Sequence, residues 1–310
     1  MTFSDDQRAL AAFIQLPFPQ AHVLRTWELQ GGLSAQMRAL ELVLPDGEYR
    51  RVVVRCPGAV AFQRDPDNIA REFRLLKVLD ANLLSVPASY YLGDIDGTPA
   101  MVTQFVDGVT EFSPVDVGSF ISQFAAQLAK IHHIDSMNND LSFLPRSSDT
   151  FHAGVNRLVT DHTQSPIGLH LREYLSTVAE QQPVNNAALL HGDYWPGNLL
   201  WNEGKLVAIV DWEDAELGDP LIDFAISRLD TLLVFGVQAM NDFTEHYRAV
   251  STAHFNQLPY WDMYAALRAA PHLAEWSAGY PQLGRPDVTE TSMRERLEWF
   301  AEQALLRAST

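Results

Sequence analysis

The chain has 310 residues, 47% hydrophobic and 20% charged, which is enough apolar material for one large domain or two smaller ones. Its formal net charge of -17 repels nucleic acid backbones and anionic lipid head groups, so both are poor partners. Cys56 is the only cysteine, which excludes an internal disulfide and a cysteine-based zinc site.

The N-terminal residues favour a cytoplasmic protein. Asp5 and Asp6 occupy positions where a secretory signal would carry positive charge. No run of residues approaches the roughly 18 apolar side chains that crossing a bilayer requires. The sequence predicts no particular oligomeric state.

Three predicted strands follow. Residues 22–30 and 37–44 are strands that meet at the turn Gly31-Gly32-Leu33-Ser34, and the second ends at the turn signal Pro45-Asp46-Gly47. The short segment 51–55 is rich in β-branched valine, which favours a third strand.

A helix is predicted to begin at Asp65-Pro66, where aspartate suits the N-cap and proline the first turn. Apolar residues at helical spacing give this helix one buried stripe, whereas Arg71 and Glu72 lie on its other faces. The stripe comprises Ile69, Phe73, Leu76 and Leu79.

Two further strands near 86–92 and 99–106 complete an antiparallel sheet of about five strands. Helical periodicity takes over after Asp107-Gly108. That periodicity is carried by Phe120, Phe124, Leu128 and Ile131. The sequence therefore predicts an α+β protein with a strand-rich domain over 1–106 and a mainly helical domain over 107–310.

The segment 187–212 interrupts the helical pattern with a predicted β-hairpin around the turn-forming residues 202–205. Asn198 opens the first strand and Asp211 closes the second, so antiparallel pairing brings both to the same end. Asp193 lies in the loop that enters this end. Two carboxylates and a carboxamide are therefore predicted to converge.

Oxygen ligands from aspartate and asparagine suit a hard ion such as magnesium. The spacing H-x-D-x-x-x-x-N from His191 to Asn198 fits the protein-kinase catalytic loop, in which the aspartate receives or orients the acceptor hydroxyl proton and the asparagine holds a metal. Asp211 stands where the second metal-binding aspartate belongs.

The stretch HGDYWPGNLLW, followed by VAIVDWEDAELGDPLIDFA, resembles the aminoglycoside phosphotransferase and choline kinase family. That resemblance implies a protein-kinase-like fold, with a small antiparallel-sheet N-lobe that has one main helix, a larger helical C-lobe, and ATP (GTP in some members) bound between them. It also implies that Asp193 is the catalytic base or hydroxyl-orienting group, and that Asn198 and Asp211 coordinate Mg²⁺.

The N-lobe elements predict the nucleotide contacts. The backbone N–H groups of the turn Gly31, Gly32 and Ser34 could cover the phosphates. The lysine that kinases carry on the third strand is absent, so we expect Arg55 to bind phosphates with Glu72 as its ion-pair partner. Arg51 remains the alternative, since register is open by a residue or two.

Two further sets of residues take their roles from the resemblance. Gln104 and Val106 lie in the segment that resembles the adenine-binding hinge, and Val53 and Ile209 are expected to enclose the base. His191 is expected to support the catalytic loop by hydrogen bonding. Asp219 and Asp223 are expected to brace that loop by accepting backbone N–H bonds.

The predicted activity is Mg²⁺-dependent transfer of the γ-phosphate of ATP to a hydroxyl of a small molecule, such as an aminoglycoside-like compound, an amino alcohol or a sugar. The acidic composition favours a cationic acceptor. Two alternatives remain open: a catalytically silent nucleotide-binding module of the same fold, and a metal-dependent hydrolase.

Acceptor contacts are expected from the helices over 228–310. Acidic and aromatic side chains there could line a pocket, but solvated helix faces explain the acidic residues better, and core packing explains the aromatic residues better. These side chains are Asp242, Glu245, Asp262 and Glu275, with Tyr260, Trp261, Tyr264 and Trp276.

Overall fold

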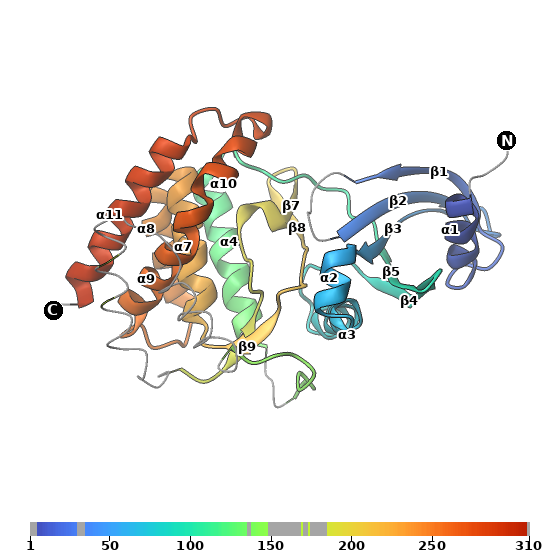
Figure 1. Cartoon of the computed structure of the whole chain (residues 1–310), viewed down its shortest axis with the longest axis horizontal. Helices are drawn as coiled ribbons and strands as arrows, with labels where there is room; N and C mark the ends of the chain where they lie inside the picture. The colour runs from blue at the N-terminus through green and yellow to red at the C-terminus, as the bar shows by residue number, and fades with distance from the viewer. Residues whose placement is uncertain are drawn as a thin grey trace. The chain divides into compact units, whose positions relative to one another are not determined.

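A computed structural model of the chain describes residues 5–29, 35–134, 138–147, 169, 173 and 185–308 (Figure 1). The chain divides into two compact units. The first comprises Met1–Asp107 with Val207–Glu213, and the second comprises Gly108–Leu206 with Asp214–Thr310. The short segment Val207–Glu213, which follows the first unit by about a hundred residues in sequence, therefore belongs to that strand-rich unit.

The first unit is built on a five-stranded antiparallel sheet with the order β1-β2-β3-β5-β4. Its strands are β1 (His22–Glu28), β2 (Ala35–Val43), β3 (Tyr49–Pro57), β4 (Ser89–Ile95) and β5 (Thr98–Gln104). The predicted antiparallel sheet is confirmed.

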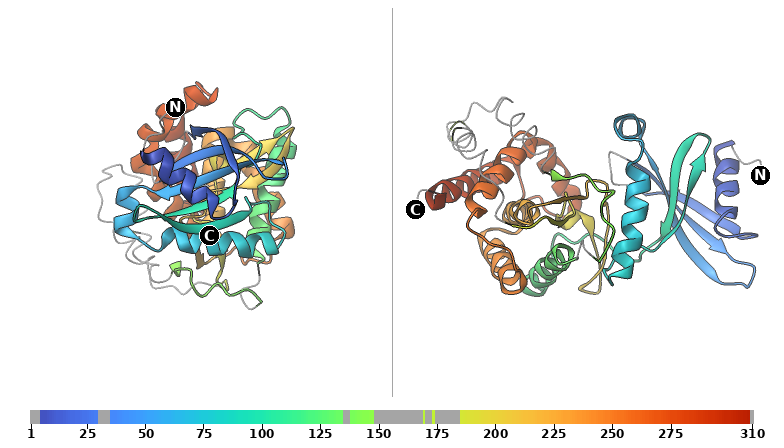
Figure 2. Two further views of the ribbon diagram at one scale, coloured as in Figure 1. Left: turned by 90° about the vertical axis from the view of Figure 1, so that its right-hand side faces the viewer. Right: turned by 90° about the horizontal axis from the view of Figure 1, so that it is seen from below.

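A helix that the sequence analysis missed, α1 (Asp5–Gln15), packs on one face of this sheet. Leu10 and Phe13 of α1 join a buried cluster with Val52 and Val54 of β3. Because side chains alternate along a strand, Val53 and Arg55 point to the opposite face. Helix α3 lies on that second face (Figure 2).

The α3 helix (Asn68–Ala81) corrects one expectation about helix faces. Glu72 is not on an outer face but is only 5% exposed, within the same stripe as Ile69 and Leu76. Phe73, placed in the stripe by periodicity, is half-buried. A charged side chain thus occupies a core position, which requires a charged partner.

The start of this region also differs from the expectation. A short helix, α2 (Ala59–Arg64), precedes α3, and the N-cap position of α3 is Asp67 rather than Asp65. The Asp65 carboxylate accepts hydrogen bonds from the Arg71 guanidinium instead, so side-chain pairing replaces the predicted capping.

The predicted hairpin is confirmed as β7 (Leu199–Asn202) and β8 (Lys205–Ile209), which form a two-stranded sheet. Glu203 and Gly204 at its turn have φ angles of 49° and 74°. Two left-handed residues in succession match the type I′ turns that two-residue hairpin loops prefer.

The second unit is mainly helical. Its long helices are α4 (Val117–His132), α7 (Leu221–Phe235), α8 (Val237–Val250), α9 (Leu258–Ala269) and α11 (Glu290–Ala308). Helix α7 lies in the middle of the others, in contact with α8, α9 and α11 (Figure 2), and all but two of its residues are buried. The predicted helical periodicity of α4 is confirmed, since its four marker residues are all buried.

The remaining elements of this unit are short. They are β6 (Ala188–Leu190) paired with β9 (Glu216–Gly218), α10 (Leu273–Gly279), and 3₁₀ turns at Pro196–Asn198, Ala270–His272 and Tyr280–Leu283. Among the helices of the described residues, none combines the length and the apolarity that crossing a membrane demands.

Candidate active site

The loop between β6 and β7 presents Asp193 on a closely hydrogen-bonded backbone. The Trp195 N–H donates to the Asp193 carbonyl over 3.1 Å, and the Asn198 N–H donates to the Trp195 carbonyl over 3.0 Å. Gly192 has a φ of 85°, and a Cβ there would collide with the Asp214 carbonyl. The loop therefore requires glycine before its aspartate.

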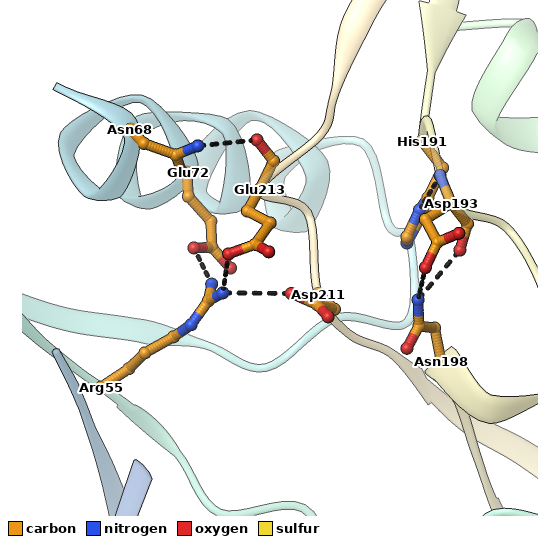
Figure 3. Close-up of polar contacts among 8 residues, drawn as sticks. All are labelled: Arg55, Asn68, Glu72, His191, Asp193, Asn198, Asp211 and Glu213. Atoms are coloured by element: carbon orange, nitrogen blue, oxygen red, sulfur yellow. Dashed lines mark hydrogen bonds and ion pairs between the residues drawn. The ribbon is translucent and has the colours of Figure 1, made fainter. Parts of the chain in front are cut away.

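Asp193 and Asn198 are in direct contact (Figure 3). The Asn198 Nδ2 donates to the Asp193 carbonyl over 2.9 Å and to Asp193 Oδ2 over 3.1 Å. These bonds orient the carboxamide, and its Oδ1 accepts no hydrogen bond from any other described residue. Asn198 is buried, whereas the Asp193 side chain is 38% exposed and so accessible to a ligand.

A buried carboxylate on α7 braces this loop. Asp223 accepts hydrogen bonds from the His191 N–H over 2.7 Å and the Gly192 N–H over 3.0 Å. Burial alone would raise the pKa of Asp223, but its hydrogen bond to His132 and the charges and N–H donors around it lower the pKa overall. His191 is also buried, and its Nδ1 accepts from the Asp193 N–H over 3.3 Å.

The first unit contains a second charged cluster, centred on Arg55 of β3 (Figure 3). One guanidinium nitrogen pairs with Glu72 of α3, and the other lies 3.0 Å from Asp211 and 2.6 Å from Glu213. Arg55 is 7% exposed, so these ion pairs are largely shielded from water. The Asn68 side chain also donates to the Glu213 carbonyl over 3.0 Å, which attaches α3 to this segment.

Three carboxylates share the single guanidinium of this cluster. The pKa of Glu72 is raised to about 7, because burial and the charges of Asp211 and Glu213 together outweigh the lowering effect of Arg55. Asp211 also has a left-handed backbone, with a φ of 66°. A perturbed pKa beside an uncommon backbone geometry makes this cluster a candidate functional site.

Comparison with known proteins decides the family. The model of the phosphotransferase enzyme family matches residues 28–247, which is well over half of the chain. The chain belongs to this family. The predictions of a protein-kinase-like α+β fold and of a small-molecule kinase are confirmed.

The solved structures that this phosphotransferase resembles share its fold. A macrolide 2'-phosphotransferase type I is 18% identical, with a TM-score of 0.62, over 93% of this chain and 99% of that one. A thermostable mutant of aminoglycoside phosphotransferase APH(4)-Ia, in a ternary complex with AMP-PNP and hygromycin B, is 17% identical, with a TM-score of 0.63, over 95% and 98%.

A curated relative matches part of the phosphotransferase. The mouse (Mus musculus) acyl-CoA dehydrogenase family member 10 is 27% identical over 199 residues, which is 58% of this chain. The match spans only 18% of the mouse protein.

The predicted phosphate-binding residues of the phosphotransferase have different surroundings. Arg55 contacts Glu72, whereas the alternative, Arg51, pairs with Asp107 and stacks on the Phe105 ring. The Arg51 side chain is 36% exposed. The geometry therefore favours Arg55 as the arginine that is held by the α3 glutamate.

The predicted glycine turn, with Gly31, Gly32 and Ser34, lies outside the described residues. Of the hinge residues, Gln104 uses its N–H to donate to the Ala88 carbonyl over 2.8 Å. The main chain of Val106 forms no hydrogen bond with other described residues, so both its polar groups are available.

The residues expected to enclose the base are Val53, which is half-buried, and Ile209, which is fully buried. The Ile209 N–H donates to the Ser85 carbonyl over 2.8 Å. Both residues therefore have a structural role in the first unit. Their predicted contact with a base stays a prediction.

One predicted brace is wrong. Asp219 does not bond the catalytic loop: its Oδ1 accepts from the Leu221 N–H over 2.9 Å and from Asn185 Nδ2 over 3.0 Å. Asp219 precedes the first turn of α7, whose exposed N–H groups attract a carboxylate. Asp223, one turn later, is the residue that reaches the loop.

Sequence reasoning missed two charged neighbours of Asp193. The Arg268 guanidinium on α9 lies 3.6 Å from Asp193 Oδ1. Asp230 of α7 has its pKa raised to about 7 by burial and by the Asp193 charge, while Arg268 lowers it. Neither residue belongs to a short motif, so only the packing of α7 and α9 reveals them.

The acidic residues expected near an acceptor do not form one group. Asp242 bonds Gln238, and Glu275 lies near His272, both on exposed helix surfaces. Asp262 is instead 1% exposed and pairs with Arg228. Within the described part of the chain, no group of three or more His, Cys, Asp or Glu side chains could hold a metal ion.

Proposed function

We propose that this phosphotransferase transfers the γ-phosphate of ATP to a hydroxyl of a small molecule, with Asp193 as the base or hydroxyl-orienting group. The observation that carries the proposal is the paired side chains of the catalytic loop. Asn198 donates one hydrogen bond to the exposed Asp193 carboxylate and a second to the Asp193 backbone carbonyl. A carboxylate fixed this way can accept or orient the proton of an incoming hydroxyl.

Asn198 and Asp211 are the proposed ligands of Mg²⁺. The Asn198 carboxamide oxygen accepts no hydrogen bond from other described residues, and Asp211 supplies a carboxylate with a local excess of negative charge. One asparagine and one aspartate suit Mg²⁺, which keeps several waters and shares phosphate oxygens. When bound, the ion would neutralise charge on the transferred phosphate.

Arg55 is the proposed phosphate-binding cation in place of lysine. Glu72 fixes one of its terminal nitrogens, and the second nitrogen, now paired with Asp211 and Glu213, can turn to a phosphate oxygen. The planar fork of arginine permits these two contacts at once. Gly31, Gly32 and Ser34 are proposed to cover the phosphates.

The hinge segment is the proposed adenine site. The main chain of Val106, which forms no hydrogen bond with other described residues, supplies one donor and one acceptor, and Gln104 ends the strand before it. The nucleotides named in similar structures, AMP-PNP and ADP, support ATP as the donor, and GTP is the alternative.

The proposed acceptor is a hydroxylated, cationic small molecule in the cytoplasm. Similar structures contain hygromycin B or streptomycin, or carry the name of a macrolide phosphotransferase. The net charge of -17, with Asp230 near Asp193, supports a cation. Aminoglycosides, amino alcohols and sugars are the classes to screen.

The test begins with acceptor-dependent ADP release, screened over these classes and macrolides. With an active acceptor, Asp193→Ala should lower turnover at least ~100-fold, as expected for loss of a general base. AMP-PNP with Mg²⁺ should stabilise the variant and the wild type equally. Asp242→Ala, on an exposed helix face, is the matched control and should keep full turnover.

Two outcomes separate the alternatives. Near-normal turnover of Asp193→Ala would remove this residue from the mechanism. Stabilisation by AMP-PNP and Mg²⁺ without any acceptor-dependent ADP release would instead favour a catalytically silent nucleotide-binding module.

A further inference from the structure

The helical unit contains a cavity of about 350 Å³ that shares no residue with the catalytic loop. We call it the arginine pocket, after three of the side chains that line it. Its lining residues are Arg228, Asn241, Thr244, Arg248, Phe255, Asn256, Leu258, Pro259 and Arg307.

The charge of the pocket is opposite to that of the chain as a whole. None of its lining residues is acidic, although acidic side chains outnumber lysine and arginine by 39 to 22 in the sequence. The Asp262 carboxylate, which is 1% exposed, accepts from one nitrogen of Arg228 with both oxygens. Arg307 lies 3.8 Å from the same carboxylate. Two guanidinium groups thus share one carboxylate, and the third arginine of the pocket, Arg248, feels its charge.

The two outer arginines, Arg248 and Arg307, are exposed, whereas Arg228 is buried. Arg228 is 2% exposed and fixed, since its Nε also donates to Thr244 Oγ1 over 2.9 Å. Arg248 is exposed and makes no ion pair with any described residue, and its guanidinium stacks 4.5 Å from the Phe255 ring centre. Stacking on an aromatic ring leaves the edge of a guanidinium available for an anion.

Like charge accumulates in this pocket. Burial lowers the pKa of Arg248, and the nearby Arg228 and Arg307 lower it further, with Asp262 opposing them. An anion between the outer arginines would relieve this repulsion. The carboxamides of Asn241 and Asn256, which form no hydrogen bonds with other described residues, add neutral donors at the rim.

We propose that the arginine pocket binds the phosphate group of a small molecule. Among the described residues, the three lining arginines exceed Asp262 by two positive charges, which a phosphate dianion balances. The oxygens of phosphate also match the donor fork of arginine. The cavity is as large as the smaller ligand sites of proteins, about 300 Å³ and above, so it has room for more than a bare phosphate ion. An organic phosphate monoester is the ligand we expect.

Binding is tested with defined probes on the full chain. Inorganic phosphate, glycerol 3-phosphate and glucose 6-phosphate are titrated by calorimetry and by thermal unfolding, against sodium acetate and sodium chloride at equal ionic strength. We expect saturable binding of the phosphates alone. Tighter binding of either organic phosphate identifies a monoester as the ligand, whereas equal binding identifies inorganic phosphate.

Variants locate the site. Arg248→Gln and Arg307→Gln remove one charge each from exposed side chains and should weaken phosphate binding about tenfold, which is 1.4 kcal/mol and the scale of one charge-assisted hydrogen bond. Arg294→Gln is the matched control, since it removes an exposed arginine of α11 that pairs with Glu290 outside the pocket. It should bind phosphate as the wild type does.

The proposal is overturned by either of two results. One is that no phosphate stabilises the protein more than sodium chloride does. The other is that binding is saturable but unchanged in the Arg248→Gln and Arg307→Gln variants, which would place the phosphate elsewhere. The readout is binding rather than phosphate transfer, so the outcome is independent of the proposed kinase activity.

Discussion

Replacing Arg55 by methionine tests the electrostatic centre of the first unit. The substitution keeps the length and apolar stem of the side chain but leaves Glu72, Asp211 and Glu213 without their shared cation. Because Glu72 is 5% exposed, its charge cannot be hydrated in place. Removing one partner of a buried ion pair costs about 3–5 kcal/mol.

The loss of folding stability in Arg55→Met should grow as the pH rises. The pKa of Glu72, about 7, lies above its ordinary value of 4.5, so the protonated form favours folding. Its contribution to stability is complete below about pH 4.5 and is lost as pH rises through 7. Arg55 lowers this pKa, so the variant should have a still higher one and should lose more stability than the wild type between pH 6 and 8.

The assay is thermal and urea unfolding of four proteins at pH 6 and pH 8. At about 2–4 °C per kcal/mol, Arg55→Met should unfold about 10 °C below the wild type at pH 8. The matched control, Arg51→Met, breaks an ion pair with Asp107 that is half-exposed and should cost at most about 1 kcal/mol. The double variant Arg55→Met/Glu72→Gln should regain at least about 2 kcal/mol, because the most deeply buried of the three carboxylates is then neutral.

Equal losses of stability in Arg55→Met and Arg51→Met would show that the Arg55 ion pairs contribute no more than an exposed pair does. A double variant no more stable than Arg55→Met alone would also contradict the prediction, because the cost would then arise from packing rather than from the uncompensated Glu72 charge.

Two further predictions concern α7. Asp223→Asn removes the negative acceptor of the His191 and Gly192 N–H groups and should lower the free energy of unfolding in urea by about 2–4 kcal/mol. Asp287→Asn on the surface is the control and should lower it by less than about 1 kcal/mol. Similar losses of stability in the two variants would contradict the bracing role. The pKa of Asp230, about 7 against an ordinary 3.8, means that its contribution to stability is complete below pH 3.8 and is lost as pH rises through 7. From pH 5.5 to 8 the wild type should therefore lose about 2 kcal/mol more than Asp230→Asn, and parallel pH profiles would exclude the shift.

The elements that the sequence predicts best are those with strong local signals. The hairpin at 199–209 has two left-handed turn positions that the residues Glu203 and Gly204 accept, and its strands are correct to within about two residues. The catalytic loop is likewise dictated locally, since Gly192 is the residue whose backbone the loop requires.

Charge pairing that depends on tertiary contacts was harder to predict. Periodicity placed Glu72 outside the stripe of α3 because a carboxylate is normally exposed, and only β3 supplies the arginine that makes its burial tolerable. Glu213 was likewise overlooked, although its position two residues after Asp211 in a predicted metal-binding motif was a usable signal.

Helix α7 shows why such contacts matter together. Nearly all its side chains are buried, and two of its three charged residues are tied to fixed partners: Asp223 to the backbone of the catalytic loop and Arg228 to Asp262. The third, Asp230, is repelled by the Asp193 charge, which contributes to its raised pKa. Buried charges are tolerated only where partners are fixed, so α7 cannot shift without breaking at least one of these attachments. A rigid central helix is therefore what holds Asp193 at a constant position relative to the rest of its unit.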